Sequence, residues 1–285
     1  YECAFDVVTP IKGNYLVDAE LIAICHEIIT KFDILKQRNV TFRINHTSLV
    51  RAIFLYYSVP ATKYRSVLDL VEEYLSDKII RNKKHLIASV AALLPAKNGQ
   101  SVCALVDSLL VTDTPISNLS STNLKVIIKG RGEATALAKG AIRELETIIS
   151  LSQAMGVNRP INLCVNFTMG FDCLRGSILW NVIGETRPGK KQIIAHGGRY
   201  DYQLEDFQKS CHKLRELYCA GFTILMEKLL TCLNQSNEHH SVVDLVVFVT
   251  GLRPPVKDVA QLMNSLWSAD IKCCFIESLS PQVDD

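Results

Sequence analysis

The sequence predicts an α+β protein in which an antiparallel sheet packs against helices. Strand-like and helical patterns alternate over residues 1–58, helical patterns alone fill residues 59–132, and strands return after residue 160. The returning strands are joined by a short segment rich in Gly, Thr and Pro, residues 184–191, which predicts a hairpin. Because strands joined by a short turn pair antiparallel, the sheet is expected to be antiparallel.

Composition sets limits on the function. The 285 residues, 48% of them hydrophobic, suffice for one large core or two smaller ones. The 31 basic and 29 acidic residues nearly cancel, so an RNA partner would need a local basic patch. No apolar stretch approaches the roughly 18 residues of a membrane helix, so no membrane partner is expected. Ten cysteines without a C-x-x-C pair predict reduced thiols, no metal site and a cytoplasmic location.

Residues 1–58 form the first part of the predicted core. "CAFDVV" indicates a strand, and apolar residues at helical spacing over 18–31 indicate an amphipathic helix with Asp18 as its N-cap. "VTFRI" (40–44) alternates as a half-buried strand does. Asn45 or Thr47 is then the expected N-cap of a helix through "LVRAIFLYY".

Residues 59–132 indicate a helical insertion. Three amphipathic patterns, at 65–75, 84–94 and 101–111, are interrupted by "AKNGQ" and followed by a polar loop over 112–123.

Residues 133–241 form the second part of the core. A long helix over 133–155 is expected to end at Gly156. Strands follow at 161–167, 177–184 and 191–195, then a long helix at 207–233 and a linker at 234–241.

Residues 242–285 change in character. "VVDLVVFVT" is nearly continuous apolar, which is typical of a fully buried strand. A helix near 256–269 and the strand "IKCCFIE" (271–277) complete a β-α-β unit. Since so few residues cannot build a full α/β domain, we interpret this segment as the start of a truncated one.

The paired glycines of "QIIAHGGRYDYQL" (192–204) raise a separate question. Adjacent glycines supply positive φ, or they let a ligand or another backbone come close. On the residues alone a tight turn between strands is favoured over a ligand cradle.

Three segments resemble the histidyl-tRNA synthetase family: "YECAFDVV", "DAEL" and "GGRYD". The resemblance implies a class II aminoacyl-tRNA synthetase-like antiparallel sheet with a helical insertion, followed by the start of an anticodon-binding-like α/β domain. It also implies that Gly197 and Gly198, followed by Arg199, form a ligand-pocket turn against the aminoacyl-adenylate site.

The chain departs from the family where substrate is bound. The family segment "RGLDYYTG" corresponds to residues 169–176, in which Met169 replaces the arginine and Cys173 and Leu174 replace the tyrosines. Methionine has neither charge nor hydrogen-bond donor, so it cannot stabilise developing negative charge.

Other pocket positions also differ. Glu2 replaces a glutamine, Asp6 is kept, and Lys228 replaces an arginine that lies against ATP, while lysine lacks the planar fork of guanidinium. Leu225 replaces a glycine, and His196 stands where a small residue is expected. These departures predict a degenerate pocket with no catalytic residue and no cofactor.

The segments "INHTSLVRAIFL" and "AHGGRYD" are more similar to one branch, the synthetase-like regulatory domains of general-control starvation-sensing kinases. Those kinases phosphorylate the alpha subunit of translation initiation factor two. The resemblance implies a cytoplasmic homodimeric domain that senses uncharged tRNA or ribosome-linked signals and relays them to a kinase domain of the same chain. Two alternatives stay open: an active synthetase paralogue and a pure dimerisation scaffold.

Two basic clusters are candidate tRNA contacts. One contains Lys83 and Lys84, and the other places Arg187, Lys190 and Lys191 on the predicted hairpin tip. Each phosphate that such a cation neutralises would make binding salt-dependent. The alternative for either cluster is an ordinary solvated surface.

Overall fold

The computed structural model describes residues 1–11, 13, 15–36, 39–76, 82–94, 98–167, 178–187, 190–201, 217–233, 244–249 and 256–277. The chain divides into two compact units, residues 1–235 and 236–285.

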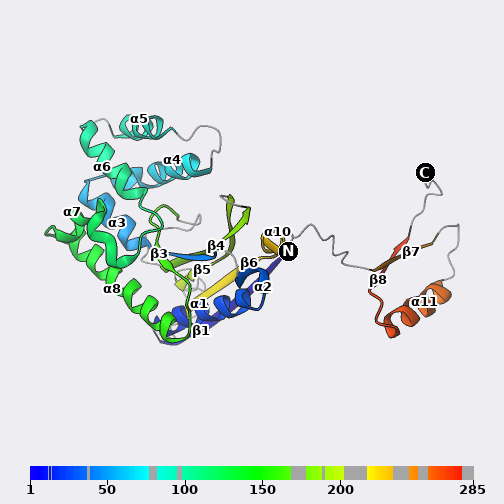
Figure 1. Cartoon of the computed structure of the whole chain (residues 1–285). Helices are drawn as coiled ribbons and strands as arrows, with labels where there is room; N and C mark the ends of the chain where they lie inside the picture. Colours follow the sequence, from blue (N-terminus) through cyan, green and yellow to red (C-terminus); the bar gives the residue numbers. More distant parts are fainter. Residues whose placement is uncertain are drawn as a thin grey trace, which may run out of the picture. The chain divides into compact units, whose positions relative to one another are not determined.

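A six-stranded sheet forms the centre of the first unit (Figure 1). Its strand order is β1-β6-β5-β4-β2-β3, and every neighbouring pair is antiparallel except β2 and β3. The predicted hairpin is confirmed as β4 and β5. The strands are β1 (Glu2–Thr9), β2 (Thr41–His46), β3 (Ile161–Leu163), β4 (Ile178–Arg187), β5 (Lys190–Arg199) and β6 (Tyr218–Leu225).

Helices pack on this sheet and on one another. Contacts join α1 to β6 and α8, α8 to α3 and β2, and α10 to β4 and β5. The helices α4, α5 and α6 form a further group that reaches the rest through α3 (Figure 1). The α-helices are α1 (Tyr15–Thr30), α2 (Asp33–Lys36), α3 (Thr47–Tyr56), α4 (Tyr64–Ser76), α5 (Lys83–Leu93), α6 (Gly99–Leu109), α7 (Leu124–Lys129), α8 (Glu133–Ala154) and α10 (Met226–Leu233). The described residues also contain two short 3-10 helices, η1 (Ala61–Lys63) and η2 (Ile116–Ser121).

One hydrophobic core runs through the whole first unit. Across the sheet, aromatic rings follow one another from Phe42 to Trp180 to Phe222, with ring centroids 6.3 and 5.7 Å apart. Buried residues of the insertion helices, such as Val67 and Val102, belong to the same core cluster. The insertion therefore shares its core with the sheet.

The predicted helix at 207–233 is wrong over most of its described part. Residues 218–225 form β6 in the middle of the sheet, and only 226–233 are helical; residues 207–216 and the predicted linker lie outside the described residues. The cause is burial on both faces of β6, where "YCAGFTIL" is a continuous apolar run. Such a run does not show whether a segment is a strand or a helix.

Both predicted N-caps are also wrong. Asp18 is the fourth residue of α1, which begins at Tyr15. The cap of α3 is His46, whose side chain accepts a hydrogen bond from the backbone N–H of Ser48. The predicted end of α8 agrees with the structure. The helix stops at Ala154, and Gly156 follows with φ +95°, as expected of a helix-terminating glycine.

The second unit contains the predicted β-α-β arrangement. Strands β7 (Leu245–Val249) and β8 (Cys273–Glu277) pair parallel, and α11 (Val256–Ser268) connects them. Its core consists of Val247, Met263 and Cys273 among the residues that can be described. Within the described parts of both units, no helix combines the length and hydropathy needed to cross a membrane.

Replacing Gly197 with Ala should destabilise the first unit. An added Cβ would lie 2.6 Å from the Trp180 ring and 2.7 Å from the backbone oxygen of Gly221. Overpacking of this kind costs about 1–3 kcal/mol in the free energy of unfolding, which chemical denaturation would measure.

Gly140→Ala is the matched control. Gly140 lies inside α8, and an added Cβ would have no atom within 4 Å. Alanine there should stabilise the protein by up to about 1 kcal/mol. Equal effects of the two substitutions would contradict a close approach at Gly197.

Candidate functional site

The two faces of the sheet differ in chemistry. Cross-strand partners point to the same face and neighbouring rows to opposite faces. The row through Phe222, Gly197 and Trp180 belongs to the helix-covered face. The next row points the other way, and we call that side the polar face. This row consists of Ala4, Thr223, His196, Asn181, Arg43 and Asn162.

The paired glycines lie within β5, so the predicted turn is wrong. Neither glycine has a positive φ. A Cβ on Gly198 would lie 2.5 Å from the backbone oxygen of Ile178, and one on Gly221 would lie 2.1 Å from Asp6 Oδ1. The glycines therefore allow neighbouring strands and side chains to approach closely, and they do not supply a positive φ.

Asp6 is held by another residue of the chain. The Tyr200 hydroxyl donates a hydrogen bond to Asp6 Oδ1 at 2.5 Å. Burial, followed by the carboxylate of Asp6, raises the pKa of Tyr200, so the phenol keeps its proton. Tyr200 thus engages the Asp6 oxygen that occupies the space a side chain at Gly221 would need.

His196 lies in the middle of the polar row, between two charges. Burial lowers its pKa most; Lys228 lowers it further, and Glu2 raises it. The imidazole is therefore neutral at pH 7. Glu2 on β1 and Lys228 on α10 are exposed and close enough to act on His196. Glu2 and His196 thus belong to the polar face, and the charge of Lys228 on α10 acts on His196.

The neighbouring part of the row contains an unsatisfied acceptor. Asn181 is 1% exposed, and its Oδ1 atom has no hydrogen-bond partner among the described residues. Arg43, its partner in β2, makes a bidentate pair with Asp113, with both N–O distances 2.6 Å. A buried acceptor without a donor costs free energy, so a ligand donor that reached Asn181 would recover that cost.

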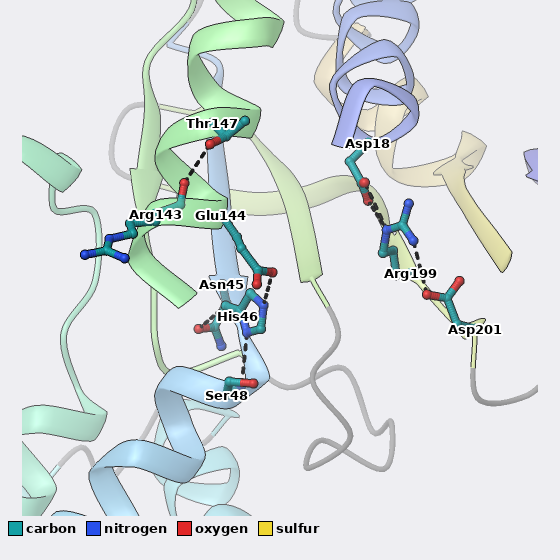
Figure 2. Close-up of polar contacts among 9 residues, drawn as sticks. All are labelled: Asp18, Asn45, His46, Ser48, Arg143, Glu144, Thr147, Arg199 and Asp201. Atoms are coloured by element: carbon teal, nitrogen blue, oxygen red, sulfur yellow. Dashed lines mark hydrogen bonds and ion pairs between the residues drawn. The ribbon is translucent and has the colours of Figure 1, made fainter. Parts of the chain in front are cut away.

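A buried ion-pair network lies on the helix-covered face (Figure 2). Arg199 Nε donates to both carboxylate oxygens of Asp18, at 3.1 and 2.9 Å, and its Nη1 donates to Asp201 at 3.1 Å. Asp201 also accepts the backbone N–H of Cys219 at 2.7 Å. Burial outweighs the attraction of Arg199 and raises the pKa of Asp18 to about 6. The network ties β5 to α1 and β6.

A second network joins β2, α3 and α8. The Nδ1 atom of His46 accepts the N–H of Ser48 at 3.1 Å, so Nε2 carries the proton that reaches Glu144 at 3.0 Å (Figure 2). This bond to His46 lowers the pKa of Glu144. Asn45 completes the arrangement by donating to the backbone oxygens of Val165 and Phe167.

The structure distributes the predicted pocket residues over both faces. Glu2 and Asp6 lie on the polar face, where Gly198 is in register with Gly221, and Lys228 on α10 is close enough for its charge to act on His196. Gly197 and Arg199 belong to the helix-covered face. Met169, Cys173 and Leu174 lie outside the described residues.

The predicted tRNA contacts differ in their surroundings. Lys83 and Lys84 are both exposed, and Lys83 forms an ion pair with Asp107. Lys190 and Lys191 are exposed at the start of β5. Of Arg187 only the backbone is described, where it pairs with Lys190.

Sequence reasoning missed His46, Glu144 and Asn181. Glu144 lies 98 residues from His46 in sequence, and Asp18 lies 181 residues from Arg199. No local pattern marks such pairs. Among the described residues, no three His, Cys, Asp or Glu side chains are placed to hold a metal ion.

Solved structures resemble this arrangement of strands and helices. A histidyl-tRNA synthetase from Nostoc sp. PCC 7120 superposes with a TM-score of 0.66, at 18% identity, over 99% of this chain and 62% of its own. The chain has the fold of a histidyl-tRNA synthetase. A Bacillus halodurans protein described as an ATP phosphoribosyltransferase regulatory subunit/histidyl-tRNA synthetase gives a TM-score of 0.61 at 14% identity, over 99% of this chain and 64% of its own. The predicted class II fold is confirmed.

Curated sequences extend the comparison, although no protein-family profile matches the chain. The human eIF-2-alpha kinase GCN2 is 26% identical over 274 residues, which cover 95% of this chain and 16% of the kinase. The cytoplasmic histidine–tRNA ligase of Dictyostelium discoideum is 26% identical over 292 residues, 99% of this chain and 56% of the ligase. The chain thus spans about a sixth of the kinase. The predicted resemblance to both groups is confirmed.

The buried Asp18 should make stability depend on pH. Its pKa is higher in the folded protein, about 6, than the ordinary 3.8, so the folded state takes up this proton first as pH falls. The contribution of Asp18 to the free energy of unfolding is complete below pH ~4. It is lost as pH rises through about 6, by roughly 2–3 kcal/mol at most. Asp18→Asn should flatten this part of the curve of unfolding free energy against pH.

Asp33→Asn serves as the comparison for that measurement. Asp33 is exposed, and its hydrogen bond to Lys36 lowers its pKa, so its contribution has the opposite sign. The decline in the free energy of unfolding between pH ~4 and ~6 should persist in the Asp33→Asn variant. If it persists in Asp18→Asn as well, Asp18 is not its source.

Proposed function

We propose that this chain is a catalytically inactive, histidyl-tRNA synthetase-like regulatory domain that senses uncharged tRNA or ribosome-linked starvation signals. In this proposal it forms a homodimer in the cytoplasm and activates a serine/threonine kinase domain of the same protein. The similarity to the GCN2 kinases of human, mouse and rat over 95% of the chain supports the link to a kinase. The synthetase fold supports a tRNA-related ligand.

The observation that carries the proposal is the composition of the polar face. His196 places an imidazole in a row where the resemblance implies a small residue, and it lies close to Glu2 and Lys228. Lys228 cannot offer the planar, stacking guanidinium that the family uses against ATP. Since Asp6 is also engaged by Tyr200, the described part of the face presents little of the family's substrate-binding chemistry.

An active synthetase is the second candidate. The Dictyostelium ligase is as similar to this chain as the kinases are, 26% identical over 99% of the chain. Asp6 and the "GGRYD" segment are kept as well. Catalysis therefore has to be tested directly.

Exposed basic residues support an RNA ligand. Lys84, Lys190 and Lys191 are exposed, and the last two lie together where the β4–β5 hairpin begins its return strand. Lys83 forms an ion pair with Asp107. We prefer the hairpin lysines as phosphate contacts because they are adjacent and exposed.

We expect no histidine-dependent ATP–pyrophosphate exchange from the natural full-length protein. Loss of a single transition-state donor typically lowers the rate roughly 10²–10³-fold, and several donors are replaced here. Met169→Arg alone should not restore exchange, because Cys173, Leu174 and Lys228 remain. The Dictyostelium ligase is the positive control; exchange above background by the wild-type protein would establish the second candidate.

Deacylated tRNA should bind with an affinity that falls steeply with salt. Charge reversal of Lys190 and Lys191 to Glu should weaken binding and reduce the slope of log K against log salt by roughly 1 for each phosphate that is no longer neutralised. The double variant Lys31→Glu, Lys36→Glu changes the net charge equally and should bind as the wild type does. Aminoacylated tRNA measured in parallel tests whether charging matters. Unchanged binding by the Lys190 and Lys191 variant would remove the hairpin from the proposal.

A further inference from the structure

A small pocket lies between η2, α7 and α8, outside the sheet faces described above. Its volume is about 200 Å³. Four aliphatic side chains line it, from Ile116 and Leu119 of η2, Ile128 of α7 and Ile142 of α8. Lys125 and Lys129 of α7 complete one side of the pocket, and Glu146 of α8 also lines it.

The surface around the pocket is basic. Lys125 and Lys129 are one helical turn apart on α7, and Lys139 and Arg143 are one turn apart on α8, so each pair shares a helix face. Arg131 lies between the two helices. All five are exposed, and no ion pair neutralises any of them within the described part of the chain.

Acidic side chains do not balance this charge. Glu144 is directed to His46, while Arg143 extends to the other side of α8 (Figure 2). Glu133 at the start of α8 and Glu146 at the pocket are the exposed carboxylates of that helix. α7, α8 and their connection therefore carry five exposed cations against two exposed carboxylates.

Size and lining identify the class of ligand. At about 200 Å³, the pocket is smaller than the roughly 300–1,000 Å³ of typical small-molecule sites and suits one large side chain. Single-stranded nucleic acids bind by stacking bases on aromatic rings, and no aromatic residue lines this pocket. An apolar floor inside a basic rim instead complements an apolar side chain flanked by carboxylates.

We propose that this surface docks an acidic segment of a partner protein. One aliphatic or aromatic side chain of the segment enters the pocket against Ile128 and Ile142, and neighbouring carboxylates meet Lys125, Lys129 and Arg143. Val126 on α7 is 53% exposed and extends the apolar surface beside the lysines. The site is independent of the tRNA-sensing role and of catalysis on the polar face.

Methyl NMR of the whole chain, labelled at isoleucine, tests the proposal at the pocket itself. The probe is a peptide of Glu and Ala residues with one central Leu, titrated to millimolar concentration. It should shift the methyl signals of Ile128 and Ile142. The same peptide with the central Leu replaced by Ala, or with every Glu replaced by Lys, should bind at least roughly tenfold more weakly.

Charge-reversal variants test whether the basic residues at the edge of the pocket contact the peptide. The double variant Lys125→Glu, Lys129→Glu should bind the Leu peptide roughly tenfold or more weakly than the wild type does. Glu146→Gln should bind it slightly more tightly. Lys190→Glu with Lys191→Glu is the matched control and should leave peptide binding unchanged. Thermal unfolding verifies that each variant is folded.

Several results would overturn the proposal. Absence of methyl shifts with the Leu peptide would do so, as would equal binding of the Leu and Ala peptides. Oligouridine RNA that shifts the same methyl groups when the peptide does not would make this surface a nucleic-acid contact instead.

Discussion

Close approach of β4, β5 and β6 is the constraint on which the site depends. Positions 197, 198 and 221 have no room for a Cβ, because strand backbone, Trp180 or Asp6 already occupies that space, so all three are glycine. On one side this lets the Trp180 ring lie between Phe42 and Phe222, tilted against both, and complete the aromatic core. On the other side it seats the Asp6 carboxylate over Gly221, within reach of Tyr200.

The same constraint explains why one strand serves two purposes. Residues of β5 alternate between the faces, so Arg199 reaches the buried Asp18 while His196 lies on the polar face. A segment that resembles a binding motif thus also carries the ion pair that joins the sheet to α1. His196 and the Arg199–Asp18 ion pair therefore lie on opposite faces of the same strand.

Local patterns predicted most elements of the first 200 residues. The spacing of apolar residues located α1, α3, α4, α5, α6 and α8, and the Gly–Pro segment located the β4–β5 hairpin. Local patterns failed at β6, since a strand buried on both faces has no alternation to recognise. They also failed at the helix starts, where Asp18 pairs with a residue 181 positions away rather than capping α1. The motifs singled out Glu2, Asp6 and Lys228 as pocket residues, but only tertiary structure reveals the surroundings of Asn181, Glu144 and the partner of Arg43.

The continuous core between sheet and insertion has a consequence for folding. Val67, Leu86 and Val102 belong to the same cluster as the sheet residues, and Thr114 pairs with Leu163 beside β3. The insertion therefore cannot melt separately from the sheet without opening apolar surface on both. Amide protons of α6 and β2 should therefore exchange with solvent through one cooperative opening.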